Sequence, residues 1–211
     1  MPGIRKVVTR SPHRRVGLVA CPWFRSTAIE YESLLERDFV RLAVLDLKNS
    51  SISEQPFTMD LGKFGHYTPD FLLTRTDGKT VVEVKPKEHA SSEKHRLRLG
   101  HAAHLLANEG YRFLVATEIY IRDDKLHERA SILLRHARSR LPLETTTRLL
   151  TLASSHPEGI AIGELAYVGG VPTSAVLNLI GRRQLYINSS LRFDASDFVY
   201  PIGGNNGCLH T

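Results

Sequence analysis

Two apolar runs separated by a polar stretch lie between residues 67 and 87, YTPDFLLTRTDGKTVVEVKPK. Phe71 to Thr74 and Thr80 to Val84 are rich in apolar and β-branched residues, and Asp77-Gly78 lies between them. An Asp-Gly pair flanked by such runs is typical of a two-residue hairpin turn, because both residues tolerate positive φ. The pattern therefore predicts a β-hairpin.

Counting outward from Asp77-Gly78 predicts which side chains this hairpin brings together. With that pair as the tip, Asp70 lies opposite Lys85, and Glu83 lies two residues before Lys85 on the same strand. Opposed residues share a face of the sheet, and so do residues two apart. Asp70, Glu83 and Lys85 are thus expected to converge, with the two carboxylates on a diagonal of roughly 7–8 Å between Cα atoms. Such a pair suits one divalent cation.

The segments around the hairpin predict an α/β order. Helical or strand periodicity gives a helix, a strand, the hairpin, a second helix, a buried strand and a third helix. Apart from the hairpin, the expected ranges are 27–45, 51–61, 92–108, 111–117 and 127–140. Ser26 or Thr27 is the expected cap of the first helix.

Two glutamates in the first predicted helix are candidates for the same site. Glu32 and Glu36 are one turn apart on the flank of the apolar stripe, where a carboxylate needs a metal or a partner. The alternative is that they are solvated and paired with Arg37 or Arg41. Periodicity does not decide between these possibilities.

The C-terminal part, residues 141–202, has a different pattern. Helices are expected at 145–154, 162–168 and 172–181, followed by a short hairpin of 185–187 with 191–193. This order predicts a small winged-helix-like domain, whose third helix would normally enter a DNA groove. Here that helix has few base-reading side chains, namely Asn178, Arg182 and Arg183. Protein docking is therefore favoured, with phosphate contact as the alternative.

Composition and charge point to an anionic partner. The chain has 211 residues and a formal net charge of +6, which favours nucleic acid. Two distant cysteines without metal-ligand spacing favour a reducing cytoplasm. No secretion signal or membrane span is expected. A basic arm is expected at 1–25, either lying along DNA or acting as a solubilising tail, and a flexible tail at 203–211. The candidate DNA contacts are Arg14, Arg15, Arg25, Lys87, Lys94 and Arg96.

Two sets of motifs carry a family resemblance. Pro69-Asp70, a hairpin and Glu83-Val84-Lys85 resemble the signature of the PD-(D/E)XK nucleases, whose restriction-endonuclease-like core is a mixed sheet flanked by helices. ESLLERDF, Gln55-Pro56, YTPDF and EVKPKE, in this order, resemble the TnsA-like transposon-end endonucleases over residues 26–122. The resemblance implies a nuclease domain at 26–140 and a TnsA C-terminal-like domain at 141–202.

The resemblance also implies roles. Asp70, Glu83 and the carbonyl of Val84 would hold Mg²⁺, with Mn²⁺ as a substitute, and Lys85 would be the catalytic lysine. Glu36, chosen over Glu32 by its spacing to Gln55, would be a second-metal or water-mediated ligand. The implied activity is cleavage at the 5′ ends of a transposon in double-stranded DNA, together with a TnsB-like transposase and a TnsC-like AAA+ ATPase. A stand-alone DNA nuclease and a non-catalytic assembly protein are the alternatives.

Overall fold

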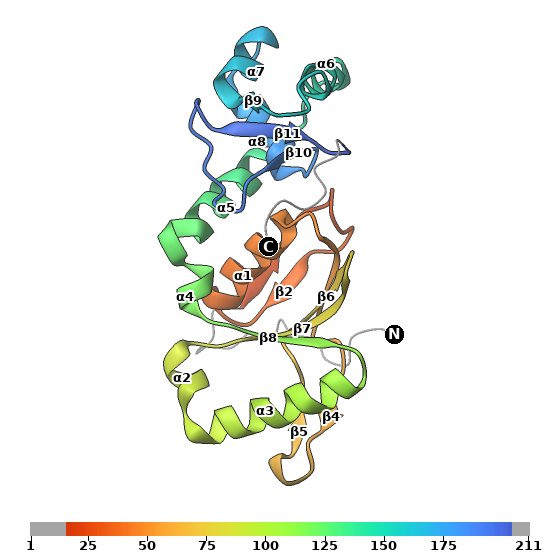
Figure 1. The fold of residues 1–211 in the computed structure, drawn as a ribbon, viewed down its shortest axis with the longest axis vertical. Coiled ribbons are helices and arrows are strands. Elements are labelled where there is room, and N and C mark those ends of the chain that lie inside the picture. Colours follow the sequence, from red (N-terminus) through yellow and green to blue (C-terminus); the bar gives the residue numbers. More distant parts are fainter. Residues whose placement is uncertain (1–15, 204–211) are drawn as a thin grey trace. The chain divides into compact units, whose positions relative to one another are not determined.

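The computed structural model describes residues 16–203, in two compact units, Met1–His127 and Glu128–Thr211 (Figure 1). The division falls before the expected boundary near residue 140, so most of α5 (Leu126–His136) belongs to the second unit. Arg14, Arg15, most of the expected basic arm and nearly all of the expected tail lie outside the described residues. No helix within 16–203 is long and apolar enough to cross a membrane.

The first unit is built on a mixed four-stranded sheet. Its order is β3 (Asn49–Glu54), β6 (Phe71–Arg75), β7 (Gly78–Val84) and β8 (Arg112–Ala116). The strand β6 is antiparallel to both of its neighbours, β3 and β7, whereas β7 and β8 are parallel. The mixed α/β fold expected from the sequence is thus confirmed.

Helices on opposite faces bury the middle of this sheet (Figure 1). On one face α1 (Leu34–Leu45) contacts β6, with the rings of Phe39 and Phe71 5.6 Å apart. On the other, α3 (Glu93–Asn108) buries Leu99 and Ala102 beside Phe113 of β8. Because both faces are covered, β7 is buried continuously from Thr80 to Val84 and does not alternate.

Short elements complete the first unit. Two small antiparallel pairs flank the sheet, and short helical turns follow β4, β7 and β8. They are β1 (Gly17–Val19) with β2 (Ile29–Tyr31), β4 (Met59–Asp60) with β5 (His66–Tyr67), η1 (Gly62–Phe64), α2 (Lys87–Ser91), α4 (Glu118–Ile121) and η2 (Asp123–Lys125).

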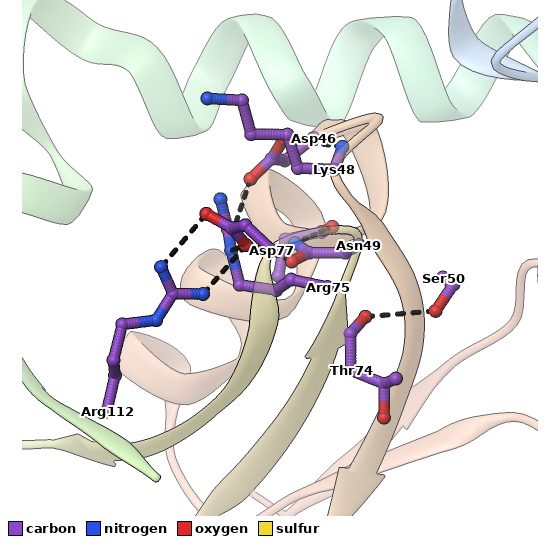
Figure 2. A network of polar contacts seen from close by, with 9 residues as sticks. Asp46, Lys48, Asn49, Ser50, Thr74, Arg75, Asp77 and Arg112 are labelled. Atoms are coloured by element: carbon purple, nitrogen blue, oxygen red, sulfur yellow. Dashed lines mark hydrogen bonds and ion pairs between the residues drawn. The ribbon is translucent and has the colours of Figure 1, made fainter. Parts of the chain in front are cut away.

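The hairpin forms, but its predicted register is wrong. Arg75 pairs with Gly78, so Thr76-Asp77 is the connection, and by the same count Asp70 lies opposite Glu83 instead of Lys85. Side chains around the tip hold this turn. Arg112 donates two hydrogen bonds to the Asp77 carboxylate, at 2.7 and 2.9 Å (Figure 2). The shift is two residues, and because side chains alternate with a period of two, it leaves every face unchanged.

Three other predictions for the first unit need correction. The helix expected from residue 27 begins at Leu34, because Ile29–Tyr31 pairs with β1. The strand expected over 51–61 ends at Glu54, since Gln55 has a φ of 40°. The buried strand expected over 111–117 is the edge strand β8, in which Leu114 is 37% exposed.

In the second unit, helices pack on a small antiparallel sheet. The helices after α5 are α6 (Leu143–Ser154), α7 (Ile162–Val168) and α8 (Thr173–Gly181). The sheet order is β10 (Leu185–Ile187), β11 (Phe198–Pro201) and β9 (Ile160–Ala161). The strand expected at 191–193 is wrong, because β10 pairs with β11.

The helix α8 is a core element of this unit. All residues from Ala175 to Gly181 are buried. The amide of Asn178 donates to the carbonyls of His136 and Ser139 at 2.8 and 2.9 Å, and Arg182 Nε donates to the Ala137 carbonyl at 3.0 Å. These contacts satisfy carbonyls at the end of α5. They also engage two of the three side chains expected to read bases.

Candidate active site

Asp70 lies where β6 begins, between the ends of two neighbouring strands. Its carbonyl accepts a hydrogen bond from the backbone N–H of Gln55 at 2.9 Å, and its Oδ2 accepts one from the N–H of Val84 at 2.7 Å. The residue after β3 thus holds the main chain of Asp70, and the end of β7 holds its carboxylate. Directly opposed residues of an antiparallel pair have Cα atoms about 4.5–5.5 Å apart, which places Asp70 beside Glu83.

Glu83 is a charged residue on the central strand, and it is only 6% exposed. A buried carboxylate needs charged or hydrogen-bonding partners, because desolvation penalises its ionised form. Both oxygens have one. Oε1 forms a short ion pair with the Nζ of Lys85, and Oε2 accepts a hydrogen bond from the Tyr67 hydroxyl at 2.9 Å. The structure therefore brings Asp70, Glu83 and Lys85 together, as the hairpin pattern predicts.

Tyr67 is a site residue that the sequence analysis missed. It lies on β5 and is 4% exposed. The guanidinium of Arg98 lies over its ring, 5.7 Å from the centroid. Burial is the largest cause that raises the pKa of the Tyr67 hydroxyl, and the negative charge of Glu83 raises it further. The hydroxyl therefore stays protonated and donates a hydrogen bond. The only sequence signal was its place in YTPDF, since neither periodicity nor charge marks a tyrosine as a carboxylate partner.

Glu36 lies in the first turn of α1, where it closes a capping box with Ser33. Its N–H donates to Ser33 Oγ at 3.1 Å, its Oε1 accepts from that hydroxyl at 2.8 Å, and its Oε2 accepts from the N–H of Glu32 at 2.7 Å. Gln55 donates to Glu32 at 3.3 Å. Burial raises the pKa of Glu36, and the charges of Glu32 and Glu83 contribute to this rise. Glu36 is thus electrostatically coupled to the site, while its side chain has a structural role.

The Asp70 carboxylate lies in an environment that disfavours its ionised form. Burial raises the pKa of Asp70 well above its ordinary value, and the negative charges of Glu83 and Glu36 raise it further. The Val84 N–H and Lys85 oppose the rise without cancelling it. Three acidic groups near one lysine leave excess negative charge in a partly buried place, and a cation would relieve it.

The donor set fits a hard divalent cation. Asp70 and Glu83 offer carboxylate oxygens, which Mg²⁺ prefers. In an antiparallel pair the N–H and C=O of one residue point towards the same neighbouring strand, so the carbonyl of Val84 lies on the side of Asp70. Within residues 16–203 no three His, Cys, Asp or Glu side chains gather in a metal-binding arrangement. Two carboxylates and a main-chain carbonyl are therefore the available ligands.

The expected DNA-contacting residues differ in their surroundings. All five N–H donors of Arg25 are used internally, on Glu54 and on the carbonyls of Thr27, Ala28 and Ile52. This arginine therefore ties the segment after β1 to β3. Lys87, at the start of α2, and Lys94 and Arg96, in the first turns of α3, are exposed.

A comparison with protein families agrees with this architecture. The family described as "TnsA-like endonuclease N terminal" matches residues 43–118. No curated protein matches the chain. The matched segment runs from α1 to the start of α4 and includes Asp70, Glu83, Lys85 and Tyr67, whereas Glu36 lies just before it. Residues 43–118 thus match the N-terminal domain of the TnsA-like endonucleases, the family that the sequence motifs predict.

Proposed function

We propose that this protein is a metal-dependent DNA endonuclease that hydrolyses phosphodiester bonds at the 5′ ends of a transposon during cut-and-paste transposition. One observation carries the proposal. Asp70, directly before β6, and Glu83 on β7 interact electrostatically beside Lys85, in a segment that matches the TnsA-like family. Opposed carboxylates without a ligand are unfavourable in a buried sheet, so their presence indicates a function.

Asp70, Glu83 and the carbonyl of Val84 are the proposed ligands of Mg²⁺, for which Mn²⁺ would substitute. The bound cation supplies Lewis-acid stabilisation of negative charge on the scissile phosphate. Glu36 is proposed to act on the cation through water or a second metal, because it is coupled to Asp70 and Glu83 but its oxygens hold the cap of α1.

The chain's own residues would then position and activate the reactants. Lys85 is held by Glu83 at the end of β7, where its ammonium can orient the attacking water and offset charge on the phosphate. Tyr67 keeps the other oxygen of Glu83 fixed. The N–H of Val84 fixes Asp70 in the same way. Preorganised groups of this kind accelerate a reaction because they need not rearrange in the transition state.

The C-terminal unit is proposed to be a winged-helix-like module that docks on a TnsC-like AAA+ ATPase, while a TnsB-like transposase cuts the 3′ ends. Its helix–strand–helix–helix–strand–strand order, from α6 to β11, supports the first part. Burial of α8 argues against base reading by that helix. Large apolar side chains are exposed elsewhere on the unit, with Tyr167 at 86% and Leu143 at 80%, and such residues favour protein contact.

Strand cleavage of an end-labelled transposon-end duplex tests this proposal. The protein is assayed with Mg²⁺, alone and mixed with its transposase and ATPase. Cleavage of the 5′ strand in the mixture, lost with Asp70→Ala, is the expected result. Cleavage by the protein alone would identify a stand-alone nuclease. An absence of cleavage under both conditions would overturn the nuclease assignment in favour of an assembly protein.

A further inference from the structure

A buried aspartate on α1 gathers three arginines outside the residues already assigned. Asp38 is 1% exposed. Its Oδ1 accepts from the Nε and Nη2 of Arg37, at 3.0 and 2.7 Å, and lies 3.6 Å from the Nη1 of Arg41. Its Oδ2 accepts from the Nε and Nη2 of Arg122, at 3.2 and 3.0 Å. We call Arg37, Arg41 and Arg122 the arginine cluster.

Two arginines of the cluster, Arg37 and Arg122, remain accessible although both contact Asp38. Three guanidinium groups lie within ion-pair distance of this one carboxylate, and Arg122 also interacts electrostatically with Glu118. The side chains remain accessible, at 27% exposure for Arg37 and 43% for Arg122. Each of these two uses only one edge of its planar fork on Asp38, so the Nη1 group is not among the atoms bonded to it. Such a fork suits the oxygens of a phosphate.

The arginine cluster lies at the same edge of the sheet as the candidate active site. The parallel strands β7 and β8 both end there, and their carboxyl ends lead into Lys85 and into α4 respectively. The carboxylate of Glu118 on α4 accepts the N–H of Lys87 at 2.7 Å, which joins the two chain segments. Figure 1 shows α4 beside α1, the helix that carries Arg37 and Arg41.

We infer that the arginine cluster binds a backbone phosphate of the DNA duplex whose scissile bond lies at Asp70 and Glu83. Asp38 would act as the positioning residue that holds the forks in place before DNA arrives. This inference rests on the proposed function for the identity of the ligand. A purely structural role for these arginines would tie α1 to α4 without affecting DNA.

The test is equilibrium binding of a fluorescently labelled duplex at several salt concentrations, in EDTA so that no cleavage occurs. Each phosphate contact contributes about 0.9 to the slope of log K against log salt concentration. Arg122→Ala is expected to lower the magnitude of that slope by about one and the affinity by several-fold. Arg37→Ala combined with Arg122→Ala should lower both further.

The matched control is Arg112→Ala, which also removes an exposed arginine from an ion pair, but at the start of β8 and beside the hairpin tip. It should leave the slope unchanged. Arg122→Lys keeps the charge, loses the planar fork and should keep most of the slope. Because Asp38 retains Arg37 and Arg41 in Arg122→Ala, this variant is expected to fold, as its thermal transition would show.

An unchanged slope and affinity for Arg122→Ala would overturn the inference, as would an equal loss in Arg112→Ala. These outcomes are separate from the proposed function. A wild-type protein that cleaves normally would retain the nuclease assignment even then. Conversely, Arg122→Ala could lower the slope and the affinity although the wild-type protein never cleaves DNA. That outcome would support phosphate binding by the arginine cluster but not the nuclease assignment.

Discussion

Asp70 and Glu83 show how a functional arrangement departs from what favours folding. Two carboxylates stand opposite each other, and the pKa of Asp70 is raised by burial and by its acidic neighbours. A side chain chosen for stability alone would avoid this pairing, because like charges on opposed positions destabilise a sheet. The destabilisation caused by the charge of Asp70 is therefore measurable as a change in the free energy of unfolding when that charge is removed.

The first prediction concerns Asp70→Asn in the absence of divalent cations. Asparagine keeps an acceptor for the Val84 N–H but removes the charge, so the variant should be more stable at pH 7 by on the order of 1 kcal/mol. When a carboxyl group has a higher pKa in the folded than in the unfolded state, the protein loses stability as its charge forms. This loss develops as pH rises from about 3.9, the pKa in the unfolded state, through the pKa in the folded state. The advantage of the variant should thus shrink as pH falls towards about 4.

Thermal or chemical denaturation across this pH range measures the difference. Asp60→Asn, at an exposed aspartate of β4, is the matched control and should show little change. Lower stability of Asp70→Asn at pH 7 would contradict the account of charge repulsion.

The second prediction concerns Tyr67→Phe. Loss of the hydroxyl leaves Glu83 Oε2 without its donor and frees the side chain to turn. Partners that orient metal ligands typically contribute 10- to 100-fold to metal affinity or activity. Mn²⁺ binding by titration calorimetry, without DNA, should weaken by roughly tenfold or more.

Tyr111→Phe provides the comparison for this experiment, because Tyr111 contacts the Phe57 ring and makes no described hydrogen bond through its hydroxyl within residues 16–203. It should bind Mn²⁺ as the wild type does. Equal Mn²⁺ affinity in Tyr67→Phe and wild type would refute the positioning role.

The convergence of Asp70, Glu83 and Lys85 was predictable because strand alternation has a fixed period, and this survives an error in register. Tyr67 was not predictable, since it reaches Glu83 from a separate short strand. The structural role of Arg25 was not predictable either, because its partner Glu54 is distant in the sequence. Its positive charge suggested DNA, whereas Glu54 and three carbonyls are its partners.

Secondary-structure elements were predicted well where periodicity is long and poorly where tertiary pairing decides. The residues before α1 are compatible with a helix, but β1 recruits them into a strand pair and Ser33 becomes the cap. The partner of β10 is β11, which begins at Phe198, seven residues after the start of the strand expected at 191–193. Local sequence carries little information about such distant pairing.

The cap of α1 gives the third prediction. Ser33→Ala removes one hydrogen bond to the N–H of Glu36 and one to its carboxylate, so the protein should lose about 1 kcal/mol of stability. Urea denaturation measures this loss. Ser50→Ala, which removes an exposed hydroxyl contact to the Thr74 carbonyl, should cost less. Equal losses in the two variants would show that the capping box does not stabilise α1.

Packing of α8 gives the fourth prediction. A Cβ on Gly181 would lie 2.3 Å from the carbonyl oxygen of Leu133, so Gly181→Ala must push α8 away from α5. Overpacking of this kind typically costs 1–3 kcal/mol. Gly100→Ala, inside α3 with no atom within 4 Å of the new Cβ, should be neutral or stabilising. A stable Gly181→Ala variant would contradict the close packing of the two helices.

The protein as a whole combines a TnsA-like domain with a second compact unit outside the matched segment. The site residues with clear chemistry lie in the first unit. Asn178 and Arg182 of the second unit, two of the three side chains expected to read bases, are bonded to its own backbone. The proposed combination of a nuclease domain with a docking module would account for this distribution. The proposed function depends most on whether Asp70 and Glu83 form a metal-dependent cleavage site.

The most direct test of that claim is Mg²⁺-dependent cleavage of the transposon-end duplex, in the presence of the partner proteins, by wild type, Asp70→Asn and Asp60→Asn. Wild type and Asp60→Asn should cleave in Mg²⁺ and stop in EDTA, whereas Asp70→Asn should bind the duplex without cutting it. Cleavage by Asp70→Asn at the wild-type rate, or wild-type cleavage that persists in EDTA, would contradict the assignment.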